Sequence, residues 1–135
     1  MTRRAVIPLT FLVMAFAGAL AHRVFAQGDQ PLDPMVIKWD KGPDKIDVSK
    51  YPAEMKRKYK VFTEICGKCH TLARAVNCDF AVEDDWERYI KRMMRRGRGI
   101  ITSEMAQDAF EFAVYDSKIR KKDLYEQKLK DAARR

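Results

Sequence analysis

The feature that most constrains this chain is a five-residue string, Cys66-Gly67-Lys68-Cys69-His70. It places two thiols three positions apart and an imidazole directly after the second thiol. Two thiols at this spacing can each add to one vinyl group of a single haem, and the adjacent imidazole can then bind the iron. The spacing is typical of covalent c-type haem attachment. It predicts one covalent haem c, with thioethers at Cys66 and Cys69 and His70 as the proximal axial ligand.

Two other uses of paired cysteines fit the sequence less well. A thioredoxin-like redox pair lies between a strand and a helix and needs no histidine, whereas this string ends a predicted helix. A structural zinc site needs a second pair of ligands, and beyond the string only Cys78 remains, with no further histidine. Because free cysteine is often buried, we interpret Cys78 as a small buried residue near the haem. Pairing of Cys78 with another chain is the alternative.

Residues 1–26 are typical of a secretory signal peptide. An arginine pair near the start is followed by an uncharged, mostly apolar run over residues 5–21, and Val24-Phe25-Ala26 offers small residues where a signal peptidase reads. We therefore predict cleavage before Gln27 and a periplasmic mature chain. An uncleaved membrane anchor is the alternative, which the short run, interrupted by proline and glycine, disfavours.

Cleavage at this position changes the charge and the histidine count. Removing 26 of the 135 residues leaves 109 and deletes three arginines and no acid, so the formal net charge falls from +8 to +5. His22 is deleted as well, which leaves His70 as the one histidine of the mature chain. A bis-histidine site within one chain is then excluded, and a methionine thioether is the usual second axial ligand. An exported chain is not expected to bind nucleic acid.

The hydrophobic periodicity predicts an all-α domain with three main helices. The first is expected over about residues 52–66, where its basic residues, Lys58 among them, are interpreted as a solvated face. The second is expected over about residues 83–95, with acids in its first turn and glycines after its end. The third begins at residue 102 or 103. We find no alternating strand pattern, internal repeat or glycine-rich phosphate loop in the sequence.

Two segments of different composition flank the predicted domain core, residues 52–116. Residues 27–51 contain prolines, glycines and aspartates, so we predict an extended leader, pinned to the domain surface through Ile37 and Trp39. Residues 117–135 hold eight basic and three acidic residues. We expect them to form a basic helical extension with an exposed, frayed end.

Residue spacing alone does not identify which methionine is the second axial ligand. Met93 and Met94 end the second predicted helix beside an Arg-Gly-Arg-Gly turn that can deliver a thioether to the iron. One of them is expected to be the ligand and the other to pack. Met55 is interpreted as core packing and Met105 as a contact near a helix cap, while Met35 lies in the leader.

Several segments together resemble the small bacterial monohaem class I cytochromes c. That family's pattern is CxxCHTLAR, then W-x-x-Y-[VI]-x-R-M, a glycine turn and a C-terminal helix. The matching segments of this chain are Cys66 to Arg74, Trp86 to Met93, and Gly99-Ile100, with further similarity at residues 47–52 and 112–122. The resemblance covers about residues 45–130.

The resemblance implies a class I cytochrome c fold, with about three main helices around one covalently attached haem. In the family, the methionine seven residues after the tryptophan binds the iron, which maps to Met93 and leaves Met94 as the alternative. The chain departs from the family pattern at Ala75, where proline is frequent, and in a methionine turn that lacks proline.

A haem with both axial positions filled has no open site for a substrate, so we expect an electron-transfer protein and not an enzyme. The expected partners are redox donors and acceptors, met through acidic patches that attract a basic surface. Membrane contact is expected only through a partner complex or an uncleaved signal. The alternatives are a five-coordinate haem that binds or senses a small gas, and a haem subunit fixed in a larger respiratory complex. Arg74 is interpreted either as a contact of a haem propionate or as an ordinary surface charge.

Overall fold

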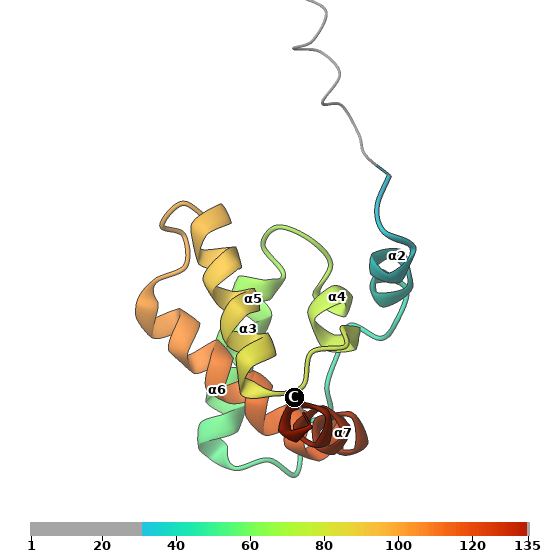
Figure 1. Ribbon diagram of the computed structural model, residues 1–135. Helices are drawn as coiled ribbons and strands as arrows, with labels where there is room; N and C mark the ends of the chain where they lie inside the picture. The colour runs from blue at the N-terminus through green and yellow to red at the C-terminus, as the bar shows by residue number, and fades with distance from the viewer. Residues whose placement is uncertain (1–30, 135) are drawn as a thin grey trace, which may run out of the picture. The chain divides into compact units, whose positions relative to one another are not determined.

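The computed structural model describes residues 31–134 (Figure 1). The predicted signal peptide and the first residues of the leader lie outside the described residues. Within residues 31–134 the regular elements are six helices and no strand, which confirms the prediction of an all-α fold. None of the described helices is long and apolar enough to span a bilayer.

The three predicted main helices are present close to their expected bounds. They are α3 (Ala53–Cys66), α5 (Glu83–Arg96) and α6 (Ser103–Arg120). Three acids in the first turn of α5 favour the positive end of its dipole. Thr102 caps α6, its hydroxyl accepting a hydrogen bond from the Met105 amide at 3.2 Å. Local caps and charges therefore fix these ends, as the sequence predicts.

The core forms where α6 packs against α3 and α5. Phe62, Trp86 and Phe112 meet there at ring-centroid distances of 5.1 Å for Phe62–Phe112 and 6.3 Å for Phe62–Trp86. The buried indole nitrogen of Trp86 donates to the Ser117 hydroxyl at 2.9 Å. α6 continues past residue 116, where the predicted core ends, and Ser117 is fully buried.

The predicted extended leader is wrong over one stretch, where α2 (Pro34–Asp40) forms. The Asp33 carboxylate accepts a hydrogen bond from the Met35 amide at 2.8 Å, and Pro34 occupies the first helical turn, which is a typical helix start. Trp39 packs edge-on against Phe80 at 6.1 Å, as a pinning residue should, whereas Ile37 is exposed. Residues 41–51 carry no regular element.

A short helix that the sequence analysis did not predict, α4 (Leu72–Asn77), packs against α2. The Asn77 amide nitrogen donates to the carbonyls of Trp39 at 3.1 Å and Pro43 at 2.9 Å, which joins the two segments. Gly42 is required at this contact, because a Cβ built there would lie 2.4 Å from the Asn77 amide nitrogen. The α2–α4 pair lies to one side of α3 and α5 (Figure 1).

The basic extension is helical and its last described residues, 129–134, are exposed, as predicted. It contains α7 (Lys122–Ala133). The Tyr125 hydroxyl donates to Glu83 at 3.0 Å, and Lys128 pairs with Asp85 at 2.6 Å, so that α7 is held at the start of α5. The acids of that first turn thus stabilise their own helix dipole and also bind the C-terminal helix.

Lys58 corrects the prediction of a solvated basic face on α3. The side chain is buried, and its ammonium pairs with Glu54 at 2.7 Å and with Glu111 of α6. The hydrogen bond to Glu111 raises the pKa of Lys58. A lysine is tolerated in such a place because both carboxylates compensate its desolvation.

Candidate functional site

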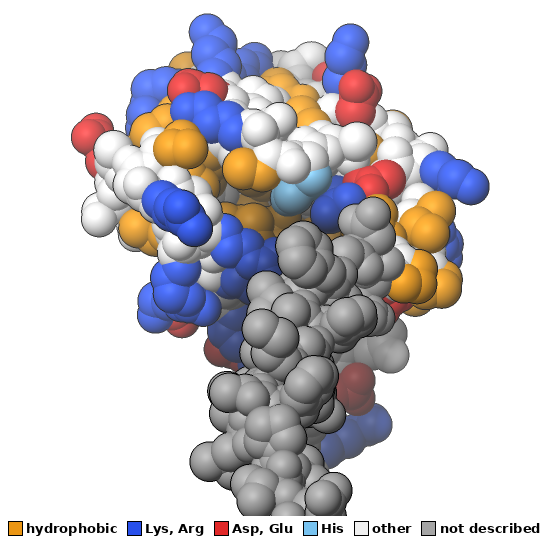
Figure 2. Space-filling view, turned by 90° about the horizontal axis from the view of Figure 1, so that it is seen from above, with side chains coloured by type: hydrophobic (Ala, Val, Ile, Leu, Met, Phe, Trp, Pro, Cys, Tyr) orange, Lys and Arg blue, Asp and Glu red, His pale blue; other side chains and the backbone are white. Residues whose placement is uncertain are grey.

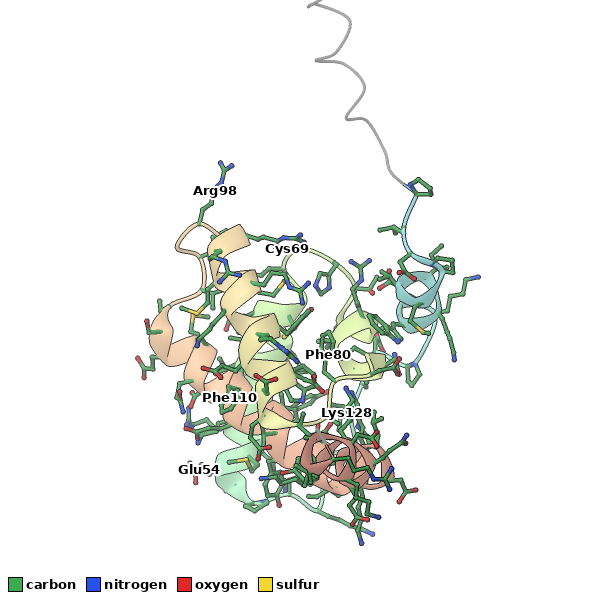
Figure 3. The ribbon with its side chains drawn as sticks, in the orientation of Figure 1. Glu54, Cys69, Phe80, Arg98, Phe110 and Lys128 are labelled. Carbon is green, nitrogen blue, oxygen red and sulfur yellow. The ribbon has the colours of Figure 1, made fainter. Side chains whose placement is uncertain are left out.

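The five-residue string lies in the turn that connects α3 to α4. Cys66 is the last residue of α3, and the Gly67 amide donates to the Thr63 carbonyl at 3.1 Å to close the helix. The side chain of Cys66 is partly buried, that of Cys69 is exposed and that of His70 is partly buried. Cys69 lies at the same end of the helical bundle as Arg98 in the α5–α6 turn (Figure 3). The helix end therefore delivers both thiols and the imidazole to one region.

This region borders a cavity of about 340 Å³. Such a volume falls within the roughly 300–1,000 Å³ that is typical of ligand sites. Its lining contains no acidic side chain among the described residues and is formed by Val36, Trp39, Ile65, Cys66, Cys69, His70, Arg74, Cys78, Phe80, Tyr89, Ile90, Arg92, Met93, Arg96 and Ile101. Figure 2 shows hydrophobic side chains reaching the surface of this face beside the histidine, with basic side chains around them.

The predicted site residues come together here with one exception. Cys66, Cys69, His70 and Met93 all line the same cavity. Met94, the alternative axial ligand, lines a different cavity between α5 and α6, together with Ala106 and Phe110. The one-residue step from Met93 to Met94 turns the side chain by about 100° around the helix, and the two thioethers accordingly face different cavities.

Met93 lies in the last turn of α5 rather than in the turn that follows it. The Met93 carbonyl accepts a hydrogen bond from the Gly97 amide at 2.8 Å, and α5 continues to Arg96. The thioether therefore projects from a hydrogen-bonded helix. The proline that the family pattern has in the methionine turn is not needed to fix the backbone of Met93.

His70 is oriented by two hydrogen bonds. Its Nδ1 lies 3.0 Å from the Thr71 carbonyl oxygen, and its Nε2 lies 3.1 Å from the Tyr89 hydroxyl. Since a carbonyl only accepts, Nδ1 carries the proton and Nε2 accepts from the phenol. This tautomer directs the Nε2 lone pair, the usual metal-binding pair of such a histidine, toward the cavity residue Tyr89.

Tyr89 was not singled out as a functional residue, although it belongs to the W-x-x-Y string. It is buried, and its ring packs against Phe80 at 5.2 Å and Trp86 at 6.0 Å. Burial raises the pKa of Tyr89, so the hydroxyl stays protonated at neutral pH and acts as the donor to His70. Spacing did not reveal this role because the contact joins the middle of α5 to the α3–α4 connection, 19 residues apart in the chain.

The thiol chemistry favours neither of the alternative uses of the cysteine pair. Burial raises the pKa of the Cys66 thiol to about 12, whereas a redox-active thiol has a lowered pKa and commonly lies at a helix N-terminus. Cys66 lies at a C-terminus. Among residues 31–134 no group of three or more histidine, cysteine or carboxylate side chains is arranged to hold a metal ion.

Cys78 is buried, as predicted, and its thiol donates to the Ala75 carbonyl at 3.2 Å. All three cysteines of the chain are free. Cys78 also lines the cavity, so that three thiols border it. The backbone carbonyl of Cys78 accepts from Lys121 at 2.7 Å, which holds the α4–α5 connection against the end of α6.

Arg74, for which two interpretations were open, pairs with Asp40. Its Nε donates to Oδ1 at 3.0 Å and its Nη2 to Oδ2 at 2.5 Å, while the Thr71 hydroxyl donates to Oδ1 at 2.5 Å. This forked contact joins α4 to α2, whose Val36 and Trp39 form part of the cavity wall. Asp40 therefore anchors one wall of the cavity and satisfies the charge of Arg74.

We expect Asp40→Asn to release α2 from α4. The hydrogen bond from Arg74 is the main reason that the pKa of Asp40 is lowered from 3.8 to about 2. A carboxyl with a lowered pKa in the folded state stabilises it above its unfolded pKa, and this contribution is lost as the pH falls from 3.8 toward 2. Hydrogen exchange of the α2 amides, corrected for intrinsic rates, should rise about tenfold over that interval in the wild-type protein, or about 1.4 kcal/mol.

In Asp40→Asn the α2 amides should already exchange about tenfold faster at pH 5 and lose the pH-dependent step, because a neutral amide cannot replace the charged contact. Asp44→Asn is the matched control, since Asp44 is exposed and forms no hydrogen bond or ion pair with the described residues. Wild-type protection of α2 in Asp40→Asn would show that this contact does not hold the helix.

The chain matches no family model, no curated protein and no solved structure. The resemblance to the class I cytochromes c therefore rests on the residues quoted for it.

Proposed function

We propose that this chain is an exported, periplasmic monohaem c-type cytochrome with a class I fold. One haem is bound covalently through Cys66 and Cys69, with His70 and Met93 as axial ligands. The observation that carries the proposal is the convergence of these four side chains on one mostly apolar cavity, from a string whose spacing is specific for haem attachment.

The donor set of the cavity fits such a cofactor. A His/Met-ligated haem c needs two thiols, one imidazole nitrogen and one thioether, and the cavity lining contains all of them. The other imidazole nitrogen is already hydrogen-bonded. The Thr71 carbonyl fixes the ring of His70 and increases the basicity of Nε2. The tyrosine on Nε2 must move aside, since one lone pair cannot serve two partners.

The proposed activity is outer-sphere electron transfer between redox proteins, and not an enzymatic reaction. When bound, the haem supplies a one-electron couple at iron. The chain's own contribution is to hold an imidazole on one side and a thioether on the other, and to surround the site with apolar walls such as Trp39, Phe80 and Ile90. A thioether ligand and an apolar surrounding both favour the reduced, less charged state.

The test is a reversible redox titration of the full chain, expressed in a bacterium that exports and loads c-type cytochromes. The expected result is a single one-electron step and a reduced spectrum that carbon monoxide leaves unchanged, because both axial positions are filled. A spectrum that shifts with carbon monoxide would indicate the five-coordinate gas-binding class instead.

The distribution of the same preparation separates a carrier from a fixed subunit. A freely diffusing carrier is expected in the soluble periplasmic fraction, whereas a subunit of a larger respiratory complex is recovered with membranes or with stoichiometric partners.

A further inference from the structure

Two arginines of α5, both exposed to solvent on one side, contribute positive charge to the rim of the cavity. Arg92 and Arg96 lie one helical turn apart, and both line it. Neither has an ion-pair partner among the described residues. The acids of α5 are engaged elsewhere. Glu87 pairs with Lys91, and the first-turn acids pair with Arg88, with Lys118 of α6 or with α7.

Arg74, the third arginine of the cavity, is different. Both of its forked donors are committed to the Asp40 carboxylate. Since none of the described lining residues is acidic, the charges of Arg92 and Arg96 are the ones left for a ligand. The guanidinium carbon of Arg92 lies over the face of Tyr89, 5.9 Å from the ring centroid.

We propose that Arg92 and Arg96 bind the carboxylate groups of the ligand that occupies this cavity. The inference rests on the proposed function, in which the ligand is a haem with two propionate carboxylates. A guanidinium offers two parallel donors to a carboxylate, and the low polarity of the neighbouring walls strengthens such a pair. Arg74 then has a structural role through Asp40, and the propionate contacts are assigned to Arg92 and Arg96 of α5 instead.

The test uses the haem-loaded full chain and compares two double substitutions that remove the same charge. Arg92→Gln with Arg96→Gln removes the pair that lines the cavity. Arg95→Gln with Arg98→Gln removes two arginines of the same helix end and turn, which are exposed as Arg92 and Arg96 are but do not line the cavity. Figure 3 shows the Arg98 side chain extending away from the bundle.

The readout is the pH dependence of the reduction potential. Ionised carboxylates paired with arginine have a lowered pKa, by one to three units in typical cases. Loss of the cavity pair is expected to raise the carboxylate pKa. The acid limb of the potential–pH profile should therefore shift to higher pH by about one unit. Substitution of Arg95 and Arg98 should leave the limb within a few tenths of a unit of the wild type, because these side chains do not line the cavity and solvent screens their charge.

Equal profiles for the two double variants, shifted or not, overturn the inference and leave all four arginines as a surface for docking to protein partners. The proposed function is judged separately, because it fails only if the wild-type chain carries no covalent haem.

If the Arg92→Gln, Arg96→Gln variant fails to load haem, the double variant Arg92→Lys with Arg96→Lys tests carboxylate binding instead. Recovery of haem content with a profile close to the wild type supports carboxylate binding, since the positive charge alone is restored. Continued loss of haem in the lysine variant overturns it.

Discussion

Exchange of both Cys66 and Cys69 for serine is expected to leave a colourless chain whose mass equals that of the polypeptide alone. A serine hydroxyl does not form the thioether that anchors a haem vinyl group. The wild-type chain, purified from the periplasm, should instead exceed the mass of its polypeptide by one haem. Intact-mass spectrometry and haem staining of a denaturing gel measure this directly.

Cys78→Ala is the matched control for that experiment. Cys78 borders the same cavity, but it lies outside the attachment string, and its thiol donates only to the Ala75 carbonyl and lies 3.9 Å from the Lys121 ammonium. This variant should keep one covalent haem, with some loss of stability from the small space left in the core. Covalent haem in the double serine variant, or its loss in Cys78→Ala, would contradict the proposed attachment.

Met93→Ala is expected to abolish the weak far-red sulfur-to-iron band of the oxidised protein. Without the thioether, the iron becomes accessible to carbon monoxide in the reduced state. The reduction potential should fall by on the order of 0.1 V, a part of the roughly 0.8 V range over which axial ligands tune haem. Absorption spectroscopy and a redox titration measure the two effects on the same sample.

Met94→Ala provides the comparison, because the two methionines lie on adjacent positions of α5 and line different cavities. This variant should keep the far-red band and a potential near that of the wild type. Survival of the band in Met93→Ala together with its loss in Met94→Ala would transfer the axial role to Met94.

The sequence alone predicts the main helices well, for local reasons. α3, α5 and α6 have apolar residues at helical spacing and end at residues whose side chains or backbone favour a cap, such as Thr102 and Gly97. The sequence does not predict α2, because proline and aspartate are typical of turns as well as of helix starts such as Asp33-Pro34. α4 has six residues, too few for a periodic pattern to be recognised.

The candidate site was predicted where its chemistry is contiguous in the chain. Cys66, Cys69 and His70 follow one another, whereas the contacts that orient them come from distant segments. The Tyr89–His70 contact spans 19 residues, and the Arg74–Asp40 contact spans 34. Pairings over such separations depend on how the helices pack, which a single sequence does not specify. For the same reason the sequence does not distinguish Arg92 and Arg96, which line the cavity, from Arg95 and Arg98, which do not.

The phenol on Nε2 of His70 has a consequence for which ions the unloaded chain can capture. Any metal that approaches this nitrogen must first displace a buried tyrosine, at a net cost of about 1 kcal/mol for the broken hydrogen bond. A stray divalent cation would not find, within residues 31–134, three or more histidine, cysteine or carboxylate side chains arranged to hold it. The tyrosine therefore blocks Nε2 of His70. Only a ligand that binds the site at several points gains enough binding free energy to displace it.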